Sequence, residues 1–237
     1  MVTSIADRLD ARIRDGRGGE PLITYYDLGS GERTELSAVT FSNWVAKTAN
    51  LLQELAVGEN DVVRLKLSQR HPGHWVTLVW EAACWRVGAT VGAAAQTGRV
   101  AALIVGPDWS GYETSTAADI IACSLHPLGL GFADELPTGV LDYALEVRGQ
   151  PDAYTGPPPS GSTTAWVDEA RSLTLAELAE VGADEAALRR LVRPTDPWST
   201  AKAALLTPIN TGGSIVIAVG DDSAGLSRLC ETELVDR

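Results

Sequence analysis

The feature that most constrains this chain is that its second half repeats its first half in shortened form. Residues 33–37, RTELS, are echoed by residues 171–174, RSLT, and a helical pattern follows each stretch. Residues 63–65, VRL, are echoed by residues 191–193, LVR, and a Pro, a Trp, a Gly and an apolar run then follow in the same order. Strand, helix and strand in succession favour parallel strands joined by crossovers. We therefore predict an α/β fold of two similar β-α-β subdomains with mostly parallel sheets.

Local patterns place the elements of this fold. The most regular helix is predicted over residues 41–55, where apolar residues recur at helical spacing, with Ser37 or Thr40 as its cap. Two β-rich runs, residues 22–26 and 33–36, flank a turn cluster and predict a hairpin. Further predicted elements are strands at 61–67, 89–93, 100–105 and 120–125 and a helix at 75–87.

A proline-rich run divides the chain. Residues 149–161 contain Pro151 and three consecutive prolines. Consecutive prolines hold the chain extended and cannot donate hydrogen bonds to a sheet. We predict a linker here, with a first α/β subdomain at 1–148 and a second, shortened one at 162–237.

Composition limits the classes of partner. The chain has 237 residues, of which 45% are hydrophobic, and can bury the core of a folded protein. Its formal net charge of −12 opposes binding to nucleic acid or to an anionic membrane. Three widely spaced cysteines, and no apolar run of about 20 residues, give no sign of a disulfide framework or of a membrane span. We expect a cytoplasmic protein.

Sequence motifs in the first 95 residues follow a recognisable order. A YYD strand, a GERT turn, the helix LSAVTFSNWVAKTANLL, the strand DVVRLKL and the segment WVTLVWEAACWRVGATV succeed one another. This order resembles the opening subdomain of AMP-forming acyl-CoA synthetases. Downstream, SLHPLGLGF, PTGVLDYALEVRG and TPINTGGSIVIA resemble a small actinobacterial family that is distantly similar to those synthetases. The resemblance implies a doubly wound α/β core whose crevice holds ATP, an acid substrate and an acyl-adenylate.

Residues 160–163, SGST, begin like the phosphate loop of that family and then depart from it. Such a loop presents backbone N–H groups and a Lys to phosphate oxygens. Trp166 and Val167 stand where the resemblance implies a Pro and a Lys, and the carboxylates of Asp168 and Glu169 follow at once. Aligned with the internal repeat, the segment is instead predicted to be the strand before a hairpin.

These departures leave two functions open. The first is a catalytically degenerate relative of adenylate-forming enzymes that acts, without a cofactor, as a binding or interaction protein for a small molecule or a protein. Its apolar helices would also allow a homodimer. The alternative is a small-molecule enzyme that retains binding of AMP, ATP or an acyl compound.

Loop positions single out one candidate crevice. In open α/β sheets, ligands bind where loops leave the carboxyl ends of strands. Residues 68–75 are predicted to form such a loop, and residues 193–198 are its counterpart in the second half. If the halves pack about a pseudo-twofold axis, both loops line one crevice with two arginines as cations. The candidate residues are Ser68, Arg70, His71, His74, Arg193 and Asp196.

Other constellations do not predict catalysis or metal binding. Ser124 and His126 lie close in sequence, but no nucleophile elbow surrounds the serine. His71 and His74 have no Cys, Asp or Glu at ligand spacing beside them. We therefore assign no catalytic residue and no metal ligand.

Overall fold

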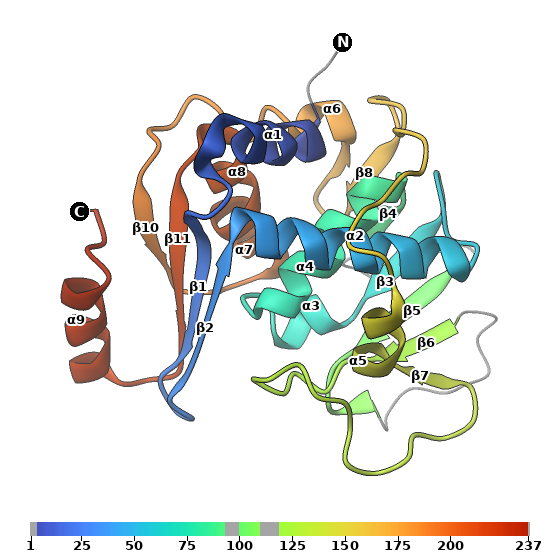
Figure 1. The fold of residues 1–237 in the computed structure, drawn as a ribbon, viewed down its shortest axis with the longest axis horizontal. Coiled ribbons are helices and arrows are strands. Elements are labelled where there is room, and N and C mark those ends of the chain that lie inside the picture. The colour runs from blue at the N-terminus through green and yellow to red at the C-terminus, as the bar shows by residue number, and fades with distance from the viewer. Residues whose placement is uncertain (1–3, 93–99, 110–118, 237) are drawn as a thin grey trace.

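The computed structural model describes residues 4–92, 100–109 and 119–236. It contains two mostly parallel β-sheets, here sheet A and sheet B, packed with helices (Figure 1). Sheet A has the strand order β10-β11-β1-β2, and sheet B has the order β7-β6-β5-β3-β4-β8-β9. The strands of sheet A are β1 Pro21–Asp27, β2 Glu32–Ser37, β10 Arg189–Val192 and β11 Ser214–Val219. Those of sheet B are β3 Val62–Leu65, β4 Thr90–Gly92, β5 Ala102–Val105, β6 Asp119–Ala122, β7 Val140–Asp142, β8 Thr164–Val167 and β9 Ser172–Thr174.

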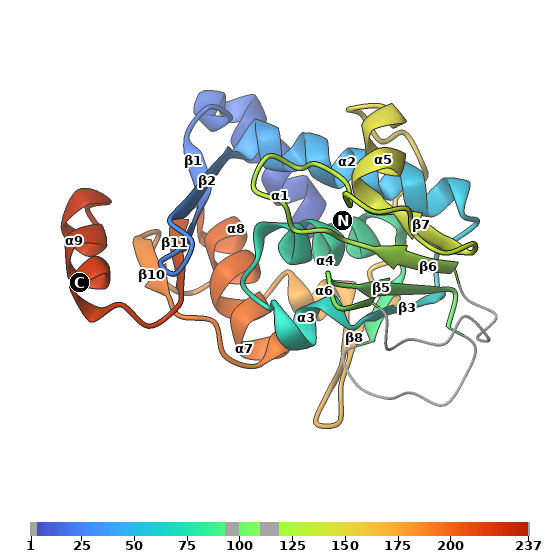
Figure 2. The ribbon, with the colours of Figure 1, turned by 90° about the horizontal axis from the view of Figure 1, so that it is seen from below.

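The α-helices pack between and around these sheets. They are α1 Ile5–Arg12, α2 Ala38–Glu54, α3 Leu67–Arg70, α4 Trp75–Val87, α5 Tyr143–Glu146, α6 Leu175–Leu178, α7 Pro197–Ala201, α8 Thr207–Thr211 and α9 Ser223–Thr232. Figures 1 and 2 show α4 and α8 between the two sheets and α9 on the far side of sheet A. The predicted α/β class with mostly parallel sheets is confirmed. None of the helices in the described part of the chain combines the length and apolar character needed to cross a bilayer.

The two halves of the chain exchange their hairpins. Hairpin β1–β2 from the first half joins β10 and β11 of the second, and hairpin β8–β9 joins β3 and β4 of the first. The order β3-β4-β8-β9 repeats β10-β11-β1-β2 with the same strand directions. Even the irregularity recurs, since β1 and β8 each shift register at the start of their antiparallel pairing. The run at 149–161 thus separates two copies of the sequence repeat, but neither sheet is built from one copy alone.

Matching caps confirm the sequence repeat. Ser37 begins α2 and Thr174 begins α6, and in both cases the side-chain oxygen accepts a hydrogen bond from a backbone N–H of the first turn. Gly88 and Gly212 end α4 and α8 with φ of 79° and 80°, a left-handed conformation that favours glycine. The repeated positions therefore carry the same local structure in both halves.

Helix α4 is buried on all sides. Nearly all of its residues are inaccessible to solvent, among them Trp80 and Glu81. A helix with no polar face belongs in the interior of a protein. It packs against α2 and also contacts α1, so it forms the centre of the main hydrophobic core.

A charged cluster fastens the C-terminal segment to sheet A. Glu233 accepts hydrogen bonds from the Tyr26 hydroxyl and the Arg189 guanidinium, and the Arg33 guanidinium lies 3.2 Å from its carboxylate. Only 9% of the Glu233 side chain is exposed. Burial alone would raise the pKa of Glu233, but these hydrogen bonds outweigh it and hold the pKa below its usual value.

We expect Glu233→Gln to lower the free energy of unfolding at pH 7 by about 1.5–3 kcal/mol, because charge-assisted hydrogen bonds are lost. A lowered carboxyl pKa contributes stability above the unfolded-state pKa, and that stability disappears as the pH falls through the folded-state pKa. Urea unfolding should therefore show the difference between wild type and variant shrinking below about pH 4. Glu231→Gln, on the exposed face of α9, is the control and should change nothing. A variant difference that persists unchanged at pH 3 would contradict this account.

Candidate functional site

The two predicted loops lie in contact at the carboxyl ends of β3 and β10. A side chain on Gly73 would place its Cβ 2.2 Å from Pro194 Cγ and 3.1 Å from Ile217 Cγ2. These distances are too short for any residue but glycine without movement of the neighbour. Glycine at this position therefore lets residues 71–74 approach the loop after β10.

Three of the six candidate residues serve the fold. The Ser68 hydroxyl is buried and donates to the Leu65 carbonyl at 2.7 Å. Asp196 caps α7 by accepting a hydrogen bond from the backbone N–H of Ser199 at 3.0 Å. His74 caps α4 through its imidazole. Ser68 and His74 are buried, whereas Asp196 is exposed and keeps its carboxylate in contact with solvent.

His74 is a buried, neutral imidazole. Its Nδ1 accepts a hydrogen bond from the backbone N–H of Val76 at 3.2 Å, and its ring centroid lies 4.9 Å from that of Tyr25 and 5.8 Å from that of Trp75. Burial lowers the pKa of His74 to about 3. It therefore acts as a helix cap within an aromatic cluster.

Of the other three candidates, Arg70 and Arg193 are exposed and His71 is half-buried. Arg70 forms an ion pair with Asp108 at 2.5 Å, and 66% of its side chain is exposed. Arg193 donates to the Gly220 carbonyl at 2.7 Å and lies 3.7 Å from the Asp221 carboxylate. His71 lies against Gly106, and burial lowers its pKa. Two arginines thus stand at this edge of the molecule, each with a carboxylate beside it.

The SGST segment forms a turn that is closed by a distant carboxylate. Glu59 accepts hydrogen bonds from the backbone N–H of Ser160 at 3.0 Å and from the Thr163 hydroxyl. The bond from Thr163, followed by that from Ser160, lowers the pKa of Glu59. Strand β8 begins directly afterwards and pairs with β9. The predicted strand is present at Thr164–Val167, but residues 160–163 themselves form a turn and not part of the strand.

The turn of the β8–β9 hairpin is filled by its own aspartate. Asp168 accepts hydrogen bonds from the Trp166 indole at 2.9 Å, from the backbone N–H groups of Ala170 at 2.8 Å and Arg171 at 2.9 Å, and from the Arg171 guanidinium at 2.7 Å. Burial alone would raise the pKa of Asp168, but these donors outweigh it and lower the pKa. From the sequence, Asp168 was noted only as a carboxylate that follows the loop. The signal for its actual role was the preference of aspartate for bonding backbone N–H groups two and three residues later.

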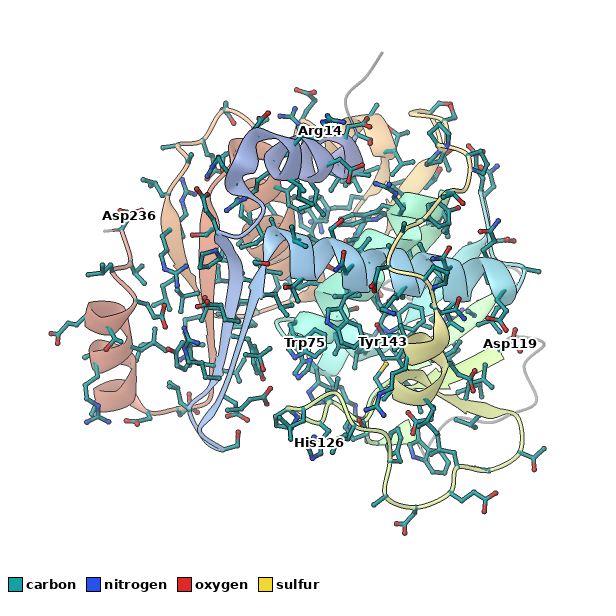
Figure 3. All side chains as sticks on the ribbon, in the orientation of Figure 1. Arg14, Trp75, Asp119, His126, Tyr143 and Asp236 are labelled. Atoms are coloured by element: carbon teal, nitrogen blue, oxygen red, sulfur yellow. The ribbon has the colours of Figure 1, made fainter. Side chains whose placement is uncertain are left out.

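The remaining constellations are not assembled for chemistry. The Ser124 hydroxyl donates to the Leu130 carbonyl at 2.5 Å, and His126 Nδ1 accepts from the backbone N–H of Leu128 at 3.1 Å. Figure 3 shows His126 near the lower rim, below Trp75 and Tyr143. Within residues 4–92, 100–109 and 119–236, no three His, Cys, Asp or Glu side chains gather into a group that could hold a metal ion.

Comparison with solved structures defines the class of fold. An acyl-CoA synthetase from Brucella canis superposes with a TM-score of 0.76 at 14% identity, covering 98% of this chain and 46% of that one. An anthranilate CoA ligase in complex with anthranoyl-AMP gives 0.70 at 14% identity, covering 97% and 47%. Coronafacic acid ligase from Pectobacterium brasiliense gives 0.69 at 10% identity, with the same coverage. The chain has the fold of the N-terminal part of acyl-CoA synthetases and spans about half the length of these enzymes.

A sequence relative defines the family. The chain is 34% identical over 242 residues to the TIGR03089 family protein of Mycobacterium tuberculosis, covering 97% of this chain and 95% of that protein. The chain belongs to this family. No protein-family model matches the sequence.

Proposed function

We propose that this protein is a non-catalytic relative of the adenylate-forming enzymes that acts, without a cofactor, as a binding or interaction protein. The observation that supports the proposal is that two donor-rich turns are occupied by the chain's own carboxylates. Glu59 fills the turn at residues 160–163, and Asp168 fills the turn at 168–171. The donors that these carboxylates occupy are the N–H groups of Ser160, Ala170 and Arg171 and the Thr163 hydroxyl, which are then not available to a phosphate.

The strength of these contacts favours a closed turn. Asp168 takes four hydrogen bonds, and a bond to a charged group contributes about 1.5–3 kcal/mol. A triphosphate would have to displace this carboxylate and then remain close to it, which adds repulsion between like charges. The formal net charge of −12 adds a long-range barrier to the approach of ATP.

A second candidate function is residual binding of a nucleotide or an acyl compound. The close approach of Gly73 to Pro194 favours this function, because the approach brings together the loops that carry Arg70 and Arg193. Two exposed guanidiniums at the carboxyl edge of a parallel sheet could hold an anionic group. Each would first have to leave its present carboxylate partner.

ATP–pyrophosphate exchange with a panel of carboxylic acids, together with thermal melting in ATP, AMP or CoA, tests both functions. We expect no exchange and no rise in the melting midpoint, because a ligand that binds the folded state must stabilise it. Exchange activity would overturn the proposal. A midpoint rise without exchange that is lost in the double variant Arg70→Ala, Arg193→Ala, but kept in the exposed control Arg14→Ala, would establish the second function.

A further inference from the structure

A cavity of about 460 Å³ lies at the opposite end of sheet B from the two loops. It is enclosed by α1, α2, the C-terminal turn of α4 and residues 152–159, which form a strap in the upper right of Figure 1. Small-molecule sites in proteins have volumes of roughly 300–1,000 Å³. The cavity is therefore large enough for an organic ligand.

Most of the cavity wall is apolar and comes from both halves of the chain. Leu9, Val45, Ala82 and Trp85 line it from the first half, and Ile209 lines it from the second. Apolar walls with a few polar groups at the rim are typical of sites that bury the body of a ligand. The cavity thus has the surface chemistry of a binding site.

Hydrogen bonds hold the strap in place on α2. The Lys47 ammonium donates to the Gln150 carbonyl at 2.5 Å and lies 3.1 Å from the Asp152 carboxylate. The Asn50 side-chain amide donates to the carbonyls of Pro151 at 3.0 Å and Ala153 at 3.1 Å. The residues expected to form a loose linker are therefore fixed at this point.

The opposite wall is also anchored. A capping box between Ser4 and Asp7 begins α1, and Arg8 donates to the carbonyls of Asn210 and Ala179, each at 3.1 Å. A cavity with both walls fixed is preformed, so a ligand need not supply the cost of ordering it.

Charge around the cavity favours a cation. Three carboxylates, those of Asp7, Asp10 and Asp152, line it together with one guanidinium, that of Arg86. Lys47 already pairs with Asp152, so the charge around the cavity remains negative by one. Arg86 is already paired with Asp10 Oδ2 at 3.1 Å and lies 6.0 Å from the centre of the Tyr154 ring. An anionic ligand would have to displace Asp10 from Arg86. A cation can instead approach Asp10 Oδ1, which makes no hydrogen bond within the described residues.

We infer that this cavity binds a small amphipathic amine, with the apolar body against Trp85 and Ala82 and the ammonium at Asp10. Binding here goes beyond the proposed function, because it requires neither the Arg70 and Arg193 loops nor the turn at 168–171. If the cavity does not bind an amine, the proposed lack of adenylation is unaffected.

Isothermal titration with 4-phenylbutylamine and 4-phenylbutyrate tests the inference, since the two probes share an apolar body and differ in head-group charge. We expect the amine to bind the wild type and the carboxylate to bind at least about tenfold more weakly. In Asp10→Asn, amine affinity should fall about tenfold, and the carboxylate should gain affinity because Arg86 loses its partner. Asp15→Asn, an exposed aspartate just after α1, is the matched control and should behave as the wild type.

A second variant distinguishes binding of the amine inside the cavity from binding to charges on the surface. Ala82→Leu places additional carbon atoms in the cavity and should abolish binding of the amine while the circular dichroism spectrum and melting remain those of a folded protein. If Ala82→Leu does not fold, the amine affinity of Asp10→Asn alone tests the inference. Equal binding of the two probes, absence of amine binding at millimolar concentration, or an unchanged affinity in Asp10→Asn would each overturn the inference.

Discussion

Trp166→Ala is expected to lower the free energy of unfolding by about 3–5 kcal/mol, the usual cost of truncating a buried Trp. Trp166 is fully buried in β8, its ring centroid lies 5.3 Å from that of Trp198, and its indole donates to Asp168. Because β8 pairs with β4 of the other half, the substitution weakens the join between the two halves as well as the hairpin turn. Chemical denaturation measures the loss directly.

Two control variants test whether the loss of stability depends on the burial of Trp166. Trp198→Ala, at a partly exposed position, should cost less than Trp166→Ala because less apolar surface leaves water there on folding. Leu128→Ala should be neutral, since that side chain is 79% exposed. A loss below about 1 kcal/mol for Trp166→Ala would contradict the role of this residue as the core of the exchanged hairpin.

Glu81→Met is expected to raise the free energy of unfolding by about 1–3 kcal/mol, the cost of burying a polar group without a hydrogen bond. Glu81 is 1% exposed in the middle of α4, and within the described residues neither carboxyl oxygen has a hydrogen-bond partner. Methionine has a similar length and no such oxygen. Denaturation at pH 7 should show the gain. Destabilisation by Glu81→Met would mean that the carboxyl group is stabilised in the folded protein.

The pH dependence of Glu81→Gln gives an independent check. Burial raises the pKa of Glu81 well above its ordinary value of 4.5. Above pH 4.5 the unfolded chain releases this proton and the folded chain keeps it, so the free energy of unfolding falls by about 1.4 kcal/mol per pH unit until the folded-state pKa is reached. Glu81→Gln should remove this decline. The buried His74 acts in the opposite direction, losing stability as the pH falls below 6.5, but it is present in both proteins and cancels in the difference.

Local sequence patterns predicted much of the fold. The predicted helix at residues 41–55 corresponds to α2, and the helix at 75–87 has the bounds of α4. The repeat between the halves, read from short echoes such as RTELS and RSLT, corresponds to two hairpins that each lead into a capped helix. These features depend on neighbouring residues, so the sequence pattern contains them.

Contacts between segments that are far apart in the sequence could not be predicted from local patterns. The exchange of hairpins pairs Val91 with Trp166 and Ile23 with Ile215, and no local pattern specifies a partner strand so far along the chain. Glu59 closes the SGST turn from 101 residues away, and no local pattern identifies so distant a partner. The cavity on α1, α2 and α4 was missed for the same reason, because its wall is assembled from five helices and the strap and contains no motif.

Burial and helix capping likewise decided which candidate residues remain available. Ser68, His74 and Asp196 had the chemistry of site residues, but backbone hydrogen bonds within the fold occupy all three. Burial, which the sequence does not state, distinguishes Ser68 and His74 from Arg70 and Arg193. Asp196 is exposed, and only its capping hydrogen bond sets it apart.

The most direct test of the two closed turns, at residues 160–163 and 168–171, is to follow the backbone amide resonances of Ser160, Ala170 and Arg171 by NMR while magnesium ATP is added. These are the N–H groups that Glu59 and Asp168 occupy. We expect the three resonances to keep their chemical shifts at millimolar ATP, in the wild type and in the control Asp15→Asn alike. Saturable shifts of Ser160, or of Ala170 and Arg171, would show that the corresponding turn admits a triphosphate and would contradict the proposal that these turns are closed.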